Sequence, residues 1–186
     1  MSGKEVKNGD LLLAEPFMWD PHFKKSVVFI CEHHEAGTIG FILNKPVGMS
    51  VHDLLSISDR FEAEVFYGGP VQTDTIHYLH TKGDIIDNAV EVASGVYWGG
   101  DFETLKFCIE NQLILPDEIK FFVGYSGWGE KQLEEEMEIN SWLLTESDRN
   151  YIFSGPESSV QLWSRVLKNV GGHWEIIAEM GNPTYN

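Results

Sequence analysis

Short apolar runs bounded by glycine, proline and charged positions recur along the first three quarters of the chain. Runs of this kind, rich in β-branched and aromatic residues, are typical of strands. The predicted strands are residues 11–14, 26–31, 38–43, 64–67, 77–80, 90–92, 96–98, 119–123 and 142–144. Short polar segments join 26–31 to 38–43 and 90–92 to 96–98, so we expect two antiparallel hairpins there.

Other segments carry apolar residues at helical spacing. Asp101 is expected to cap a helix that ends near residue 111, and Ser50 to cap a short helix over residues 50–55. From Pro156 to Gly171 the pattern predicts one long last helix. Its apolar stripe comprises Val160, Trp163, Leu167 and Val170.

The strands come in runs and do not alternate with helices, which favours an α+β fold over a doubly wound one. We predict one domain with a largely antiparallel sheet and helices packed on it. The chain has 186 residues, a length typical of a single domain. Residues 1–9 are polar and are expected to fray. The expected core includes Phe102, Leu105, Phe121, Trp142 and Trp163.

A glycine-rich segment at residues 124–129 follows the strand predicted at 119–123. Glycine permits positive φ and close backbone approach, so we predict a tight turn before a helix. The side chains that this turn would bring to one place are Tyr125, Ser126 and Trp128. Such a corner can bind an anion or can serve packing alone. Glu130 follows the last glycine, which excludes a phosphate-binding P-loop.

A second polar group stands at another strand end, where Asn44 and Lys45 precede Pro46. Strand ends beside glycine turns leave backbone N–H groups free, and a lysine adds positive charge. If this strand end adjoins the glycine corner, the two would attract a small carboxylate or phosphate. The predicted ligand-binding residues are Asn44, Lys45, Tyr125, Ser126, Gly127, Trp128 and Gln132. The alternative is that Asn44 caps the turn and Lys45 is solvated.

Acidic residues number 29 against 13 basic ones, giving a formal net charge of −16 at pH 7. This charge repels phosphate backbones and anionic membranes, so direct nucleic-acid binding is not expected. The sequence shows neither an apolar run of membrane-spanning length nor a signal peptide. We therefore expect a cytoplasmic protein. Its cysteines, Cys31 and Cys108, are expected to be buried free thiols, with a disulfide as the alternative.

Two segments are candidates for binding a protein partner. The loop from Glu15 to Phe23 contains two prolines, which block regular strand pairing, and four large apolar residues. That apolar surface must dock on the core, a partner or a ligand. The helix expected from Glu130 to Glu138 carries five glutamates, which form either a solvated face or a contact for a basic partner.

The sequence contains no nucleophile elbow, zinc-binding helix or dinucleotide-binding motif, so we expect no cofactor and no metal. The cluster from Glu32 to Glu35 lacks a second group of metal ligands and is interpreted as a solvated hairpin tip. An enzyme would need acid–base groups that converge in one cleft. The candidates are Lys45, Glu32, His33 and Tyr125. A binding module would instead line its cleft with aromatic residues, here Trp19, Phe23 and Trp128.

Ordered motifs along nearly the whole chain resemble the YqgE/AlgH family of small bacterial proteins. They include Gly9-Asp10-Leu11-Leu12-Leu13-Ala14, Asp20-Pro21-His22-Phe23, Cys31-Glu32-His33, Gly40-Phe41-Ile42-Leu43-Asn44-Lys45-Pro46, Gly68-Gly69-Pro70-Val71 and Gly124-Tyr125-Ser126-Gly127-Trp128. Residues 81–118 and the C-terminal tail resemble the family less. The resemblance implies an α+β fold around a bulged, strongly bent antiparallel sheet, and it implies no catalytic residues.

Some members of the family are named as transcriptional regulators, which the resemblance extends to this chain as an expectation. The acidic composition and the lack of a basic helix-turn-helix disfavour direct DNA contact. We therefore expect a non-enzymatic binding or regulatory protein that acts through partners. The alternative is an enzyme that acts on a small anionic metabolite near Lys45 and the glycine corner at 124–129.

Overall fold

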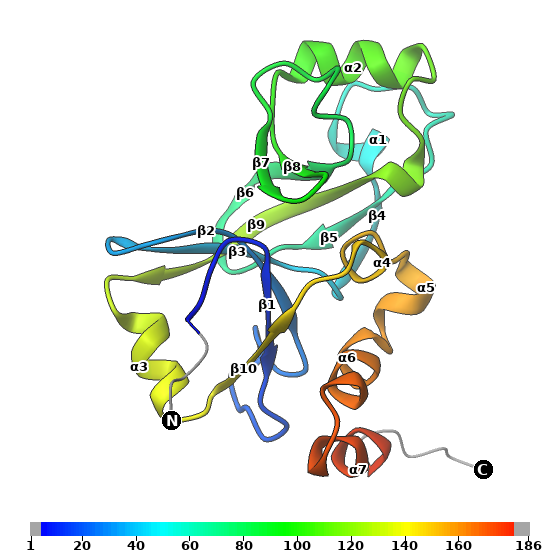
Figure 1. Cartoon of the computed structure of the whole chain (residues 1–186). Coiled ribbons are helices and arrows are strands. Elements are labelled where there is room, and N and C mark those ends of the chain that lie inside the picture. Colours follow the sequence, from blue (N-terminus) through cyan, green and yellow to red (C-terminus); the bar gives the residue numbers. More distant parts are fainter. Residues whose placement is uncertain (1–4, 181–186) are drawn as a thin grey trace, which may run out of the picture.

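The computed structural model describes residues 5–180, in which strands and helices follow one another as Figure 1 shows. In chain order the strands are β1 (Asp10–Ala14), β2 (Val27–His34), β3 (Gly37–Ile42), β4 (Pro46–Ser50), β5 (Glu64–Tyr67), β6 (Val71–His80), β7 (Val90–Ala93), β8 (Val96–Trp98), β9 (Ile119–Gly129) and β10 (Trp142–Glu146). The helices are α1 (Val51–Leu54), α2 (Phe102–Glu110), α3 (Gln132–Glu138), α4 (Arg149–Ile152), α5 (Pro156–Ser159), α6 (Leu162–Val170) and α7 (His173–Met180), with a 3₁₀ turn, η1, at Pro116–Glu118.

The ten strands of the described residues form one sheet in the order β10-β1-β2-β3-β9-β6-β8-β7. β5 pairs with β9 outside this path, and β4 pairs with β5. Within residues 5–180 the β5–β9 pair is parallel and the other pairs are antiparallel. Register shifts interrupt several pairs, among them β2–β3 and β6–β9. The predicted α+β class with a bulged, largely antiparallel sheet is confirmed.

The two halves of the sheet meet on β9. Its first half pairs with β5 and β6 and its second half with β3. Between them Gly124 has a φ of +66°, and a Cβ there would lie 2.4 Å from the carbonyl oxygen of Gly69. Only glycine tolerates so close a crossing of two backbones. The tight turn predicted at residues 124–129 is therefore wrong: this segment is a strand that bends and continues.

Most of the other local predictions from the sequence are confirmed. Both predicted hairpins form, as β2–β3 and β7–β8. The Asp101 carboxylate accepts a hydrogen bond from the Thr104 N–H at 2.8 Å and so caps α2. Pro46, however, does not end strand pairing as predicted. It is the first residue of β4, an edge strand, and a proline is tolerated there because the edge requires no donor from it.

The long last helix predicted from Pro156 is broken into α5 and α6, with α7 beyond them. The hydroxyls of Ser158 and Ser159 donate to the carbonyls of Gly155 and Pro156, and such local bonds compete with helix continuation. Val160 lies at the break and is 76% exposed, so its place in the predicted apolar stripe is wrong. Trp163 and Leu167 of the same stripe are buried, whereas Val170 is exposed, so its place in the stripe is wrong too.

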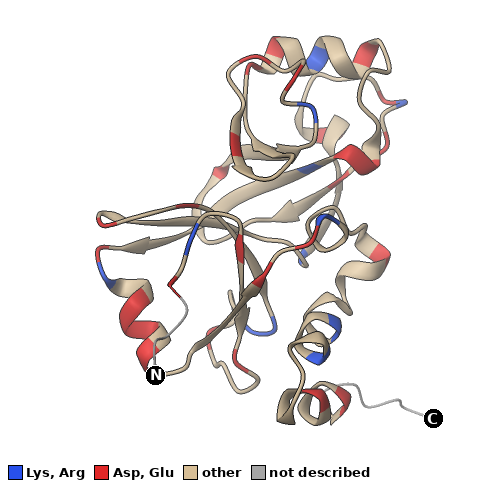
Figure 2. Cartoon of the chain, in the orientation of Figure 1, with Lys and Arg blue, Asp and Glu red and all other residues tan. Residues whose placement is uncertain are grey.

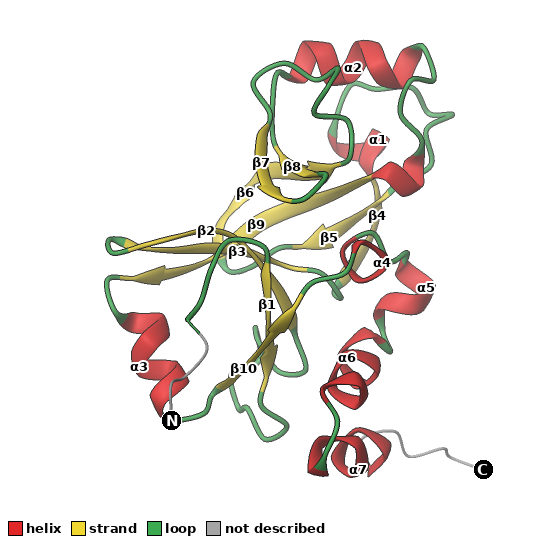
Figure 3. Cartoon of the chain, viewed as in Figure 1, coloured by secondary structure: helices red, strands yellow, loops and turns green. Residues whose placement is uncertain are grey.

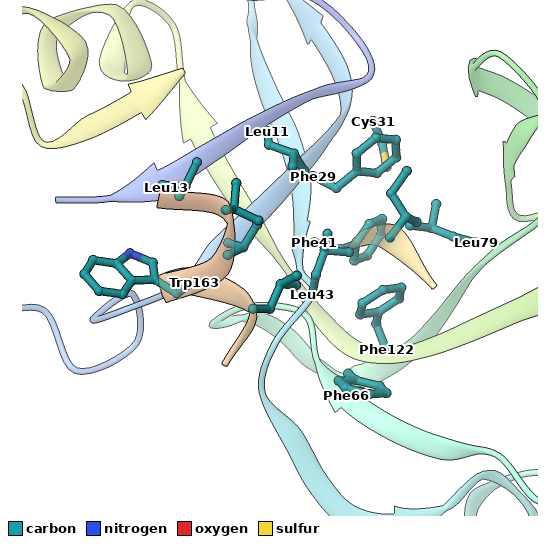
Figure 4. Packing of buried hydrophobic residues seen from close by; sticks show 14 of the residues in the cluster. Leu11, Leu13, Phe29, Cys31, Phe41, Leu43, Phe66, Leu79, Phe122 and Trp163 are labelled. Atoms are coloured by element: carbon teal, nitrogen blue, oxygen red, sulfur yellow. The ribbon is translucent and has the colours of Figure 1, made fainter. Parts of the chain in front are cut away.

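Buried side chains form three clusters on the two faces of the sheet. The largest lies between the sheet and α6, and Figure 4 shows Phe41, Phe122 and Phe66 following one another in it. A second cluster joins α2 to β5, β6 and β9, and a third lies on the opposite face of β1, β2 and β3. Figure 3 shows the helices placed around the sheet, with α2 over one end. Of the predicted core, Leu105, Phe121, Trp142 and Trp163 are buried, and Phe102 is only partly buried.

Candidate functional site

The loop from Glu15 to Phe23 is fixed by hydrogen bonds to its own backbone. The Glu15 carboxylate accepts from the N–H of Phe17 at 3.0 Å, and the Glu15 carbonyl accepts from Met18 at 3.1 Å. The Asp20 carboxylate accepts from the N–H of His22 at 2.8 Å. Short polar side chains that bond two residues onward stabilise turns in this way. The loop therefore has a defined conformation despite its two prolines.

Lys45 holds this loop against the sheet, and Asn44 holds the residues that follow the loop. Asn44 is buried, with Oδ1 accepting from the Val27 N–H at 2.9 Å and Nδ2 donating to the Lys25 carbonyl at 2.8 Å. The Lys45 Nζ donates to two carbonyl oxygens of the loop, at 2.6 and 3.4 Å; they belong to His22 and Pro21. Asn44 thus joins two strand ends, and the Lys45 ammonium is bound by the chain itself.

A partly buried tyrosine adds to the same attachment. The Tyr67 hydroxyl lies 2.8 Å from Nδ1 of His22, and the Tyr67 N–H donates to the Lys45 carbonyl at 2.7 Å. Burial lowers the pKa of the Lys45 ammonium, and the nearby Asp20 carboxylate opposes that change. Burial also raises the pKa of Tyr67, with Asp20 contributing in the same direction. Lys45 and Tyr67 therefore fix the loop through hydrogen bonds to His22.

The large apolar residues of the loop divide into two pairs. Met18 and Phe23 turn inward and pack against the third buried cluster, where the Phe23 ring lies 6.0 Å from that of Trp128. Phe17 and Trp19 turn outward, with 76% and 94% of their surfaces exposed. Side chains of this size are rarely so exposed in a well-ordered segment, so the outward pair has no role in packing the loop.

The four predicted site residues of β9 do not all line one hollow. Successive side chains of a strand point to opposite faces, and β9 continues through this segment. Ser126 and Trp128 are buried, and the Ser126 hydroxyl donates to the Gly68 carbonyl at 3.0 Å. Tyr125, Gly127 and Trp128 line a hollow of about 280 Å³ beside the β2–β3 hairpin, and Ser126 does not line it. The turn that was expected to bring Tyr125, Ser126 and Trp128 together is a continuing strand, and Ser126 lies apart from the hollow that Tyr125 and Trp128 line.

Gln132 belongs to a hydrogen-bonded group at the start of α3. Its Oε1 accepts from the Gly129 N–H and its Nε2 donates to Glu136, both at 3.0 Å. The other Glu136 oxygen accepts from two indole N–H groups, of Trp128 at 2.9 Å and Trp142 at 2.7 Å. These bonds attach α3 to β9 and β10. The polar atoms of Gln132 and Trp128 are thus engaged in holding the fold.

The acid–base candidates lie in different places. Glu32 and Tyr125 line the same hollow of about 280 Å³, but Lys45 does not line it. His33 follows Glu32 in β2 and points the other way, with Nε2 3.7 Å from a carboxylate oxygen of Glu134 in α3. General acid–base catalysis requires groups within hydrogen-bond reach of one substrate. The geometry gives the proposed enzyme no common cleft. Within residues 5–180 no cluster of three metal-ligating side chains occurs.

Comparison with known proteins assigns this chain to a family. A family model described as AlgH-like matches residues 11–175. The chain belongs to the AlgH-like family. Curated relatives match over nearly the same length. A UPF0301 protein of Chlorobium phaeobacteroides is 43% identical over 175 residues, covering 94% of this chain and 92% of the relative. A UPF0301 protein of Chlorobaculum tepidum is 44% identical over 173 residues, covering 93% and 91%.

Solved structures show the same AlgH-like architecture. The solution structure of the AlgH protein from Pseudomonas aeruginosa superposes with a TM-score of 0.73 at 25% identity and covers 100% of both chains. The crystal structure of a Corynebacterium diphtheriae protein superposes with a TM-score of 0.77 at 19% identity, covering 96% of this chain and 94% of that one. The bent sheet is thus shared. No helix among residues 5–180 has the length and apolar character needed to cross a membrane.

A buried amine in this AlgH-like chain was not predicted from the sequence. Lys120 of β9 is 4% exposed, and its Nζ donates to the Ser154 carbonyl at 2.8 Å. The same nitrogen lies 3.9 Å from the centre of the Phe66 ring. Burial lowers the pKa of Lys120 to about 7. The available signal was a single lysine between Ile119 and Phe121, inside an otherwise apolar predicted strand.

Proposed function

We propose that this AlgH-like chain is a non-enzymatic module that binds a protein partner through Phe17 and Trp19. The observation that carries the proposal is the exposure of two neighbouring aromatic side chains, 76% and 94%, on a fixed loop. Aromatic anchors contribute much of the energy of protein interfaces. An anchor that is already held in place loses less conformational entropy when it binds. This arrangement suits partner recognition better than it suits folding.

The fixed conformation of the loop does not depend on these two side chains. Met18 and Phe23 fill the inward positions, and Lys45 binds the loop carbonyls. Removing the outward aromatic groups would therefore leave the packing and hydrogen bonds of the loop in place. Binding and stability can be tested separately.

The negative charge of the chain restricts the kind of protein that can bind this surface. The formal net charge is −16, and Glu15 and Asp20 flank the exposed aromatic pair. A partner with an apolar pocket and a basic rim would complement this surface. Figure 2 shows acidic residues along α3, which offers a second contact for basic groups. Any effect on transcription, which family names suggest, would then pass through this partner, since the charge disfavours direct contact with DNA. A reducing cytoplasm fits the free, buried Cys31 and Cys108.

The test compares Trp19→Ala and Phe17→Ala with wild type and with Val160→Ala. Val160 is an apolar residue as exposed as Phe17, at 76%, and lies far along the chain, so it is a matched control. Each protein is used to capture partners from an extract of its source organism. A captured protein is then purified, and its affinity for all four chains is measured by calorimetry. Light scattering of the free chain tests whether the partner is a second copy.

Loss of a hot-spot aromatic residue is expected to weaken the purified complex at least about thirtyfold, which corresponds to roughly 2 kcal/mol. Val160→Ala should bind like wild type. The melting temperature should stay nearly the same in all three variants, because exposed side chains contribute within about 0.5 kcal/mol to stability. Equal affinity of the wild type and the Trp19→Ala and Phe17→Ala variants for every captured partner would refute the proposal.

A further inference from the structure

Lys120 lines a cavity of about 240 Å³ that lies between the sheet and the segment connecting α4 to α5. The cavity walls are mostly apolar. They include Phe66, Ile119, Phe153 and two prolines, Pro116 and Pro156. Ser154 stands opposite Lys120, with its carbonyl oxygen 2.8 Å and its hydroxyl 3.5 Å from Nζ. A lysine amine is thus positioned at the wall of a small chamber, and no residue of the loop from Glu15 to Phe23 lines that chamber.

The groups that compensate a positive charge on this amine are the Phe66 ring and the carbonyl and hydroxyl of Ser154. Among residues 5–180 no carboxylate forms an ion pair with Lys120. The acidic residues that line the cavity are Glu62, Glu64 and Asp117, and all three are exposed or half-buried. Burial lowers the pKa of Lys120 to about 7, so near neutral pH a much larger fraction of this amine is neutral than of an exposed lysine. A desolvated lysine in an apolar pocket is an activated nucleophile.

We propose that Lys120 is the nucleophile of a separate site that binds a small uncharged aldehyde or ketone as a reversible Schiff base. The neutral Nζ attacks the carbonyl carbon, and the new C–N bond gives a carbinolamine. The carbinolamine then loses its hydroxyl oxygen and two hydrogens as water, which leaves an imine between ligand and lysine. Neither an oxidant nor a metal is needed, and hydrolysis of the imine reverses the binding.

The walls of the cavity select the ligand class. Apolar side chains favour a hydrocarbon or aromatic body next to the carbonyl group. The carboxylates of Glu62, Glu64 and Asp117 stand at the exposed side and would repel a carboxylate or phosphate on the ligand. The Ser154 carbonyl, which holds Nζ, can accept from the N–H that the carbinolamine keeps before it loses water. The site therefore differs in chemistry from the anion site expected near Lys45.

The experiment treats the purified full chain with benzaldehyde and cyanoborohydride at pH 7, so that each imine is reduced to a stable benzylamine. Peptide mass spectrometry then gives the labelling rate of every lysine. Lys82 and Lys168 are internal controls, because each pairs with a carboxylate at the surface. A parallel series uses 4-carboxybenzaldehyde, which has the same ring and reactive group but carries a negative charge. A third series repeats the first in denaturant.

Benzaldehyde should label Lys120 at least about tenfold faster than Lys82 or Lys168, since an ordinary lysine is neutral in only about one molecule in 3,000 at pH 7. The advantage should fall at least about tenfold with the carboxylated probe and should vanish in denaturant. Labelling of Lys120 no faster than that of the surface lysines would overturn the proposal. Equal preference for the charged probe would overturn the ligand class. Both labelling measurements use the wild-type protein, so they do not depend on whether a variant folds.

Discussion

Replacing Lys120 by methionine measures how strongly this fold disfavours a buried ammonium group. Methionine has a similar length, a flexible side chain and no charge, so it can occupy the same space. In the folded chain, burial lowers the pKa of Lys120 from 10.5 to about 7. In the unfolded chain the group keeps its ordinary pKa. Between about pH 7 and 10.5 the unfolded state therefore binds more protons, and the stability of wild type must rise with pH.

The size of the effect follows from proton linkage. One pKa unit corresponds to about 1.4 kcal/mol, so wild type should gain about 2 kcal/mol relative to Lys120→Met between pH 7 and 9. Below pH 7 Lys120 is protonated in both states, and the full unfavourable contribution is present, about 5 kcal/mol. Methionine also leaves the Ser154 carbonyl without its donor, which costs about 1–3 kcal/mol at every pH. This cost does not depend on pH, so it shifts the difference in unfolding free energy between the two proteins by a constant and leaves its pH dependence unchanged.

The assay is urea unfolding of both proteins, followed by tryptophan fluorescence, at several values between about pH 6 and pH 9. Other titrating groups are common to the two chains, so they cancel in the difference. The expected result is a difference that is flat below pH 7 and then rises in favour of wild type. Parallel pH profiles would show that Lys120 keeps an ordinary pKa in the fold, and the reasoning from burial would fail.

Three further substitutions test the packing on which this description depends. Leu105→Ala should cost about 2–5 kcal/mol in urea unfolding, because Leu105 is fully buried between α2 and the sheet; a loss of a few tenths would mean that α2 packs differently. Gly124→Ala should lower the melting temperature far more than Gly48→Ala. Both glycines have positive φ, but only at Gly124 would a Cβ meet backbone, at 2.4 Å, whereas nothing lies within 4 Å at Gly48; equal losses would contradict the close crossing. Glu136→Ala should cost about 2–4 kcal/mol and shift the tryptophan emission, because two indole N–H groups lose their acceptor; an unchanged spectrum would contradict those bonds.

The parts of the fold that the sequence predicts are those that depend on neighbouring residues. The β2–β3 hairpin follows from two apolar runs and a short turn between them. Helix α2 follows from its apolar spacing and from Asp101 at its start. In each case the deciding contacts join residues close in the chain. The same local evidence predicted the antiparallel sheet and hence the α+β class.

The bend in β9 could not be predicted in this way. Glycines at a strand end indicate a turn when they are considered alone. Gly124 serves instead to let the backbone at Gly69 pass within contact distance, and Gly69 is far away in the sequence. A sequence pattern shows that some backbone freedom is needed, but the partner that requires it is set by the tertiary structure. For the same reason the predicted turn did not show that Ser126 would lie apart from the hollow lined by Tyr125 and Trp128.

For the predicted site near Lys45, the sequence likewise indicated the polar residues but not their partners. The polarity of Asn44 and Lys45 at a strand end was visible in the sequence, and both side chains do make specific bonds. Their partners are 17 and 23 residues away, in the segment that contains the aromatic loop. Sequence spacing gave no way to choose these partners over the glycine-rich segment. For the Lys120 cavity the sequence offered one observation, a single lysine inside an otherwise apolar strand, and its partner Ser154 is again far away in the chain.

The two proposed sites lie on opposite sides of the bend in β9, and this arrangement keeps their tests separate. Trp128, in the second half of the strand, packs against Phe23 and so supports the aromatic loop. Lys120, in the first half, faces the segment that follows α4. The residues that line the Lys120 cavity include neither Phe17 nor Trp19, and the loop from Glu15 to Phe23 comes nearest to them at Tyr67, beside Phe66. Loss of partner binding in Trp19→Ala should therefore leave the labelling of Lys120 unchanged, and Lys120→Met should leave partner binding unchanged. A joint loss in either variant would indicate that the bend at Gly124 transmits a change from one half of the sheet to the other.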